Sequence, residues 1–64
     1  MIVTRSDMNE LGYCANGARR WFARMGLDWM DFVRNGLDSE VLEATGDAMA
    51  LRLVEHVRTR DEQR

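Results

Sequence analysis

Cys14 and His56 are the two side chains that most readily suggest catalysis, and each is the sole residue of its type in the chain. A nucleophilic cysteine needs a base within hydrogen-bond reach and usually a third group that orients the base. Only the tertiary fold could bring these two residues together, and a lone cysteine beside a turn is more often a small buried filler. We therefore expect neither residue to be catalytic and do not expect an enzyme.

The same two residues are the only soft metal ligands in the chain, whereas a structural zinc site normally takes four. The single cysteine excludes an internal disulfide. The five glycines recur about every ten residues, which is typical of helix boundaries rather than of a phosphate-binding loop. The sequence thus predicts no cofactor and no metal.

Three arginines close together, Arg19, Arg20 and Arg24, are the strongest candidates for a binding site. They lie off an apolar stripe at helical spacing, which consists of Ala18, Trp21, Phe22 and Met25. Outward arginines of this kind can contact a nucleic acid or a protein. A solvated basic face is equally typical of an exposed amphipathic helix that binds nothing.

The overall charge does not favour attraction to nucleic acid, because the chain has a formal net charge of −2. The charges are unevenly placed: residues 1–35 hold five arginines and four acids, and residues 36–64 hold four arginines and seven acids. The densest acidic run contains Asp38, Glu40, Glu43 and Asp47. We interpret this run as a solvated face, with mimicry of nucleic acid as the less favoured alternative.

Helical periodicity runs through most of the chain and predicts an all-α fold, a compact single domain of four to five short helices. The first helix is expected to begin with Ser6 as its N-cap, and residues 15–17 (ANG) to form a turn. A second helix is expected over residues 18–25. This helix-turn-helix outline keeps open a DNA-binding architecture.

Further caps and stops divide the rest of the chain. Asp28 is expected to cap a third helix that ends at Gly36, Ser39 to open a fourth, and Asp47 to cap the last and longest. The inward stripe of that last helix is predicted to contain Ala50, Leu53, Val54 and Val57, widened by Met49, Leu51 and His56.

The expected domain covers residues 6–58, with an N-terminal arm over 1–5 and a frayed polar tail over 59–64. Residues 1–4 (MIVT) are the only β-prone segment, and an isolated strand would have nothing to pair with. The opening MIVTR is too short for the apolar region of a signal peptide, and no apolar run is long enough to span a membrane. We expect a cytoplasmic protein with Cys14 reduced and no membrane partner.

Residues 18–27 (ARRWFARMGL) resemble the stretch of MerR-type regulators in which a recognition helix carries an arginine, two aromatic residues and a terminal GL. The resemblance implies that Arg19 or Arg20 contacts DNA and that Arg24 contacts a phosphate. The chain departs from that family where a basic wing should follow, because DWMDF places acids there instead.

A longer stretch, roughly residues 11–58, resembles small proteins encoded in bacteriophage genomes and prophages. The blocks GARRWFARMGLDW and TGDAMAL carry this resemblance, which implies the cytoplasm of a bacterial host or an assembling phage particle as the setting. From these features we expect a non-enzymatic interaction module that binds a host or phage protein, or a second copy of itself, through Arg19, Arg20 and Arg24. The alternative is a helix-turn-helix regulator that uses the same arginines on DNA. A third, less favoured interpretation is a homodimeric assembly factor, in which dimerisation makes up for the small core.

Overall fold

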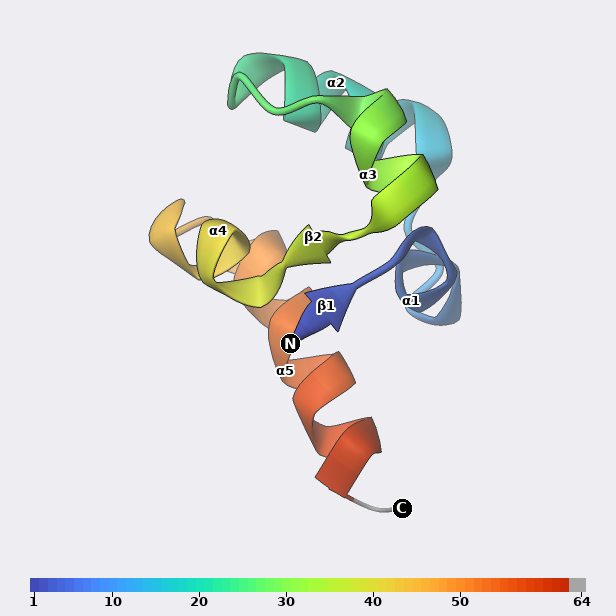
Figure 1. Ribbon diagram of the computed structural model, residues 1–64, viewed down its shortest axis with the longest axis vertical. Coiled ribbons are helices and arrows are strands. Elements are labelled where there is room, and N and C mark those ends of the chain that lie inside the picture. Colours follow the sequence, from blue (N-terminus) through green and yellow to red (C-terminus); the bar gives the residue numbers. More distant parts are fainter. Residues whose placement is uncertain (63–64) are drawn as a thin grey trace.

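A computed structural model describes residues 1–62 and shows five helices with a small two-stranded sheet (Figure 1). The predominantly α-helical fold predicted from the periodicity is confirmed. The elements are, in chain order, β1 (Ile2–Val3), α1 (Arg5–Glu10), α2 (Ala15–Arg24), α3 (Trp29–Asn35), β2 (Leu37–Asp38), α4 (Ser39–Ala44) and α5 (Ala48–Glu62). None of the helices in this part of the chain is long and apolar enough to cross a membrane.

The N-terminal residues do pair, contrary to the sequence prediction. β1 runs antiparallel to β2, with Val3 opposite Leu37, and the backbone N–H of Ser39 donates to the carbonyl of Met1 at 2.8 Å. Val3 has no exposed surface and belongs to the core. The segment expected to be an arm is therefore built into the fold by a strand partner distant in the sequence.

Gly36 makes this pairing possible, because it ends α3 and leads directly into β2. Its φ of 76° lies in the left-handed region that favours glycine. A Cβ atom at this position would lie 2.6 Å from Cγ2 of Ile2 and 2.9 Å from the carbonyl oxygen of Val3. The absence of a side chain thus lets β1 approach the end of α3.

The first helix begins two residues earlier than predicted, because Thr4 rather than Ser6 is the N-cap. The Thr4 hydroxyl accepts from the backbone N–H of Asp7, and the Asp7 carboxylate accepts from the backbone N–H of Thr4 at 2.8 Å. This reciprocal pair is a capping box. Ser6 has no acid three residues later and so could not form the same reciprocal pair.

The predicted turn over residues 15–17 is also wrong, because these residues form the first turn of α2. The connection from α1 lies over residues 11–14 instead, where Gly12 has a φ of 74°. Asn16 and Gly17 lie in the first turn of α2, where the backbone N–H groups have no intrahelical partners.

Asp28 and Asp47 cap helices as predicted, and α4 begins at Ser39 as predicted, although its N-cap is Asp38. Asp28 caps α3, with its Oδ1 accepting from the backbone N–H of Asp31 at 3.0 Å. The Asp47 carboxylate accepts from the backbone N–H groups of Met49 and Ala50 at the start of α5. α4 is capped by Asp38, so Ser39 is the first residue inside the helix.

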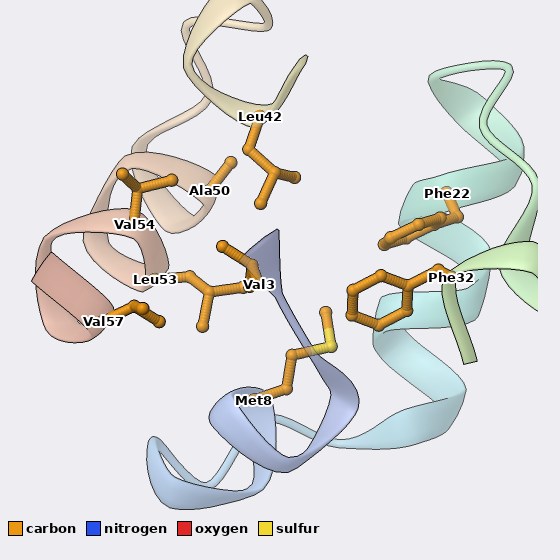
Figure 2. Close-up of a cluster of buried hydrophobic side chains, with 9 residues drawn as sticks. All are labelled: Val3, Met8, Phe22, Phe32, Leu42, Ala50, Leu53, Val54 and Val57. Atoms are coloured by element: carbon orange, nitrogen blue, oxygen red, sulfur yellow. The ribbon is translucent and has the colours of Figure 1, made fainter. Parts of the chain in front are cut away.

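The hydrophobic core has two parts that meet at Val3 and Met8 (Figure 2). Phe22 of α2 and Phe32 of α3 form one part, with ring centroids 4.8 Å apart. The other part joins α4 and α5 and consists of Leu42, Ala50, Leu53, Val54 and Val57. The predicted inward stripe of the last helix is confirmed, but Met49 and Leu51 are exposed and do not widen it.

Candidate functional site

The arginines of α2 lie on the exposed side of the helix but do not share one face. Arg20 and Arg24 are four residues apart and therefore neighbours along the same side. Arg19 is about 100° around the helix axis from Arg20, because successive residues turn by that angle. The site predicted from the sequence thus consists of one arginine pair and one separate arginine.

No acidic side chain neutralises these three arginines within residues 1–62, where the ion pairs involve His56, Arg58 and Arg60. The nearby acids Asp28 and Asp31 were the obvious candidates. Asp28 caps α3, and Asp31 accepts from the side-chain amide of Asn35 at 2.8 Å. The guanidinium groups of α2 therefore remain available to an external partner.

An apolar groove lies beside the arginine pair, between α2 and the start of α5. Its volume is about 280 Å³. Met8, Leu42, Ala50 and Leu53 are among its apolar lining residues. Gly17, Ala18, Trp21 and Arg24 line it from α2, and Asp47 and Met49 from α5. Tyr13 and Cys14 complete the lining, and the Tyr13 hydroxyl donates to the carbonyl of Met49 at 3.0 Å.

Trp21 forms much of the α2 side of this groove and belongs to an aromatic cluster. Its ring packs edge-on against Phe22 with centroids 5.5 Å apart, and Phe22 packs in the same manner against Trp29 at 5.3 Å. The contact between Phe22 and Trp29 joins α2 to α3, whereas Trp21 and Phe22 both belong to α2. The Nε1 atom of Trp21 is buried and has no hydrogen-bond partner in the described chain. A buried donor without an acceptor is unfavourable, so this part of α2 is not fully satisfied by the chain itself.

Cys14 is the residue before α2 and, contrary to the sequence interpretation, is exposed rather than buried. Its Sγ accepts no capping hydrogen bond. The backbone N–H groups of Gly17 and Asn16 nevertheless lower the pKa of the thiol, and the positive charge of Arg20 adds to their effect. No hydrogen bond joins Cys14 to His56 in residues 1–62.

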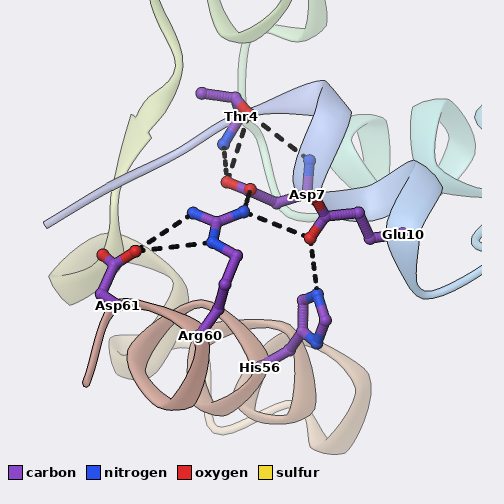
Figure 3. Close-up of polar contacts among 6 residues, drawn as sticks. All are labelled: Thr4, Asp7, Glu10, His56, Arg60 and Asp61. Carbon is purple, nitrogen blue, oxygen red and sulfur yellow. Dashed lines mark hydrogen bonds and ion pairs between the residues drawn. The ribbon is translucent and has the colours of Figure 1, made fainter. Parts of the chain in front are cut away.

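A second polar cluster joins α1 to the last turns of α5 (Figure 3). Arg60 donates to both Asp7 and Glu10, and Nε2 of His56 lies 2.8 Å from Oε1 of Glu10. Burial acts to raise the pKa of Asp7, but the hydrogen bond from Thr4 and the charge of Arg60 outweigh it and hold this pKa below its ordinary value. The cluster is internally satisfied and fixes α5 against α1.

This cluster corrects the predicted frayed tail. α5 continues to Glu62, and Arg60 within it is held by Asp7. Residues 63–64 of the predicted tail lie outside the described residues. The ion pair with α1 anchors a segment whose polar composition alone indicated fraying.

The acidic run contributes largely to folding. Asp38 and Asp47 cap helices, and Glu43 pairs with Arg58 at 2.8 Å. Of these four acids, only Glu40 has a side chain without a hydrogen-bonded partner among residues 1–62. In residues 1–62 no three side chains of histidine, cysteine, aspartate or glutamate come together as a metal site.

The sequence interpretation missed the groove and misplaced some of the residues beside it. Met25 was expected inside but is 42% exposed, because α2 ends at Arg24 and Met25 is its C-cap. Met49 was also expected inside and is 55% exposed at the groove. The signal that could have found the groove is the run of small residues Ala15, Gly17 and Ala18, which leaves α2 without bulky side chains near its start.

Comparison with known proteins gives no relative: no family model, no curated protein and no solved structure matches this chain.

Proposed function

We propose that this protein is a non-enzymatic interaction module whose binding surface is the exposed side of α2 together with the adjoining groove. The partner is a protein, either of a bacterial host or phage or a second copy of this chain. The observation that carries the proposal is the juxtaposition of unpaired guanidinium groups, Arg20 and Arg24, with an open apolar groove lined by Trp21 and Met49.

The composition of this surface supports a protein partner. Tryptophan and arginine dominate the energetically important residues of protein interfaces, and methionine is enriched there. Methionine side chains are unbranched and adapt to the shape of a partner. Elsewhere on the molecule, Arg58 and Arg60 are engaged by acids of the chain itself, so they offer less to an external ligand.

DNA binding is the alternative, and two observations favour it. α1 and α2 are joined by the short connection over residues 11–14, and Asp28 and Asp31 do not neutralise the arginines of α2. Against it stand the net charge of −2 and the few free cations on this side of the molecule. Affinity for DNA depends mainly on the number of phosphates that cationic side chains neutralise.

The experiment that separates the two is an amide NMR titration of the labelled protein with generic duplex DNA at low and at higher salt. A protein-binding module is expected to give no shifts at residues 17–25 in either condition. Salt-sensitive shifts confined to those residues would instead support the DNA alternative, because counterion release makes DNA binding strongly salt-dependent.

A direct test uses the tagged protein and its Arg20→Glu, Arg24→Glu variant to capture partners from host extract. The proposal expects at least one protein that the wild type retains at about 0.3 M salt and that the variant loses, since apolar contacts survive screening. Retention of the same proteins by both forms would contradict it. Concentration-dependent thermal stability would identify the partner as a second copy.

A further inference from the structure

The groove beside Trp21 has chemically different sides, which restricts what it can bind. The α2 side carries Arg24 at the groove itself and Arg20 one turn earlier on the same side of the helix. The α5 side carries Asp47, whose Oδ2 atom already accepts two backbone hydrogen bonds. A bound molecule therefore meets the positive charge of arginines along the α2 edge. Along the α5 edge it meets the Asp47 carboxylate, which already caps α5.

We infer that the groove binds an amphipathic α-helix of another protein. The apolar face of that helix enters the groove, and acidic residues line the edge of this face that lies against α2. This inference rests on the proposed function and names its partner by chemistry. Charge complementarity determines which edge of the partner helix is acidic. Carboxylates of the partner pair with Arg20 and Arg24, and none of its acids faces Asp47. A helix-in-groove arrangement is a recurrent mode of peptide recognition, with anchors at positions i, i+3, i+4 and i+7.

The dimensions of α2 set the length of the occupant. α2 has ten residues and is therefore about 15 Å long. A partner helix lying alongside it needs about three turns. Its apolar anchors would contact Trp21 and Met49, which line the groove and keep accessible surface. Met8, Leu42 and Leu53 form the floor of the groove and belong to the buried core.

Gly17 provides a way to close the groove without damaging the fold. It lines the groove from α2, its φ is not in the left-handed region, and nothing lies within 4 Å of a Cβ atom built there. Leucine at this position has room in the groove and replaces a poor helix former with a good one. Ala23→Leu is the matched control, because Ala23 is exposed on a different side of α2 and does not line the groove.

The experiment is a selection from a displayed library of three-turn amphipathic helices in which both edges of the apolar face vary in charge. The folded full-length chain is the target, and Gly17→Leu serves as the counter-selection. We expect binders that the Gly17→Leu protein does not retain, with aspartate and glutamate enriched along one edge only. The indole Nε1–H signal of Trp21, assigned with Trp29→Phe, should shift when a selected peptide binds.

The affinities of a selected peptide for three variants then test the groove and the arginine pair separately. Gly17→Leu and the Arg20→Glu, Arg24→Glu variant should each weaken its Kd at least about tenfold, and Ala23→Leu by no more than about twofold. Circular dichroism of each variant checks that the helical fold is retained.

Three results would overturn the inference: no binders, binders with basic or symmetrically charged edges, or binders that Gly17→Leu retains at unchanged affinity. In the last case, a loss of binding in the double arginine variant would leave the proposed function standing and only the groove assignment would fail. If neither variant weakened binding, the arginine surface would fail as well.

Discussion

Arg60 and Arg24 carry the same guanidinium group in opposite surroundings. Arg60 of α5 is bound by Asp7, Glu10 and Asp61. Asp7 and, to a smaller extent, Glu10 raise the pKa of Arg60. Arg24 of α2 lies beside an apolar groove, and none of the acids in residues 1–62 pairs with it. The ion pairs of Arg60 hold α5 against α1, whereas Arg24 on α2 has no acidic partner among residues 1–62.

The difference shows how to separate structural from functional charge in a chain this small. Both regions have arginine at helical spacing, so the sequence pattern alone does not distinguish them. A guanidinium bound to a buried carboxylate is needed by the fold, because loss of one partner leaves the other desolvated and unpaired. A guanidinium with no partner contributes little to folding and is free to act on something else.

The largest expected effect is at the α1–α5 junction. Asp7→Ala removes both the capping box of α1 and the buried partner of Arg60, so we expect the free energy of unfolding to fall by about 2 kcal/mol. Urea denaturation followed by circular dichroism measures this change. Asp61→Ala is the control, since Asp61 is exposed and lies at the periphery of the same cluster. An equal loss in both variants would contradict the central role of Asp7.

The pH dependence of stability tests the same junction with the wild-type chain. The pKa values of Asp7 and Glu10 are lowered from ordinary values of 3.8 and 4.5. Their stabilisation is therefore fully present above those ordinary values. It is lost as the pH falls below them and through the lower folded-state pKa values, because the unfolded chain binds protons first. The urea midpoint should stay level from about pH 7 to pH 5 and then decline. In Asp7→Asn the decline should be shallower, and an unchanged slope would exclude Asp7 as its source.

A smaller effect is expected on the arginine side. Arg19→Ala combined with Arg20→Ala should change the free energy of unfolding by no more than about 0.5 kcal/mol, because neither side chain has a partner in the fold. Urea denaturation under the same conditions provides the comparison with Asp7→Ala. Unfolding of this variant would show that the two arginines stabilise the fold. The proposal that they contact a partner would then fail.

The smallest effect concerns the thiol at the start of α2. Because Cys14 is exposed and its pKa is lowered, a larger fraction is thiolate at neutral pH than in the unfolded chain. We expect alkylation of the native protein to be about two- to fivefold faster than in urea. The rate is followed by mass spectrometry, with Arg20→Ala expected to reduce it slightly. Equal rates in the native and unfolded chains would show that α2 does not activate the thiol.

The part of the fold that the sequence predicted best is the part encoded locally. Asp28 and Gly36 bracket α3 as expected, because a side-chain cap and a left-handed glycine act over only a few residues. The buried stripe of α5 was likewise readable from its period. Thr4 was missed only because Ser6 is the more conspicuous cap, although the spacing from Thr4 to Asp7 is that of a capping box.

The features that could not be predicted depend on residues far apart in the chain. Two residues are too few to signal β2, yet they give β1 its partner. Arg60 holds the end of α5 only because the fold places Asp7 beside it. The groove exists because the small residues of α2 face α5, and no pattern within α2 states which helix lies opposite.

The sequence by itself determined the helical class, the caps of α3 and α5 and the three arginines of α2, because periodicity, caps and side-chain charge are local properties. Tertiary structure alone decided which arginines are neutralised and which remain free, since that depends on which acids come within a few ångströms. It also determined where apolar surface stays accessible, as in the groove lined by Trp21 and Met49. The proposal of a binding surface at α2 rests on both of these features, for which the sequence supplied the residues but not their neighbours.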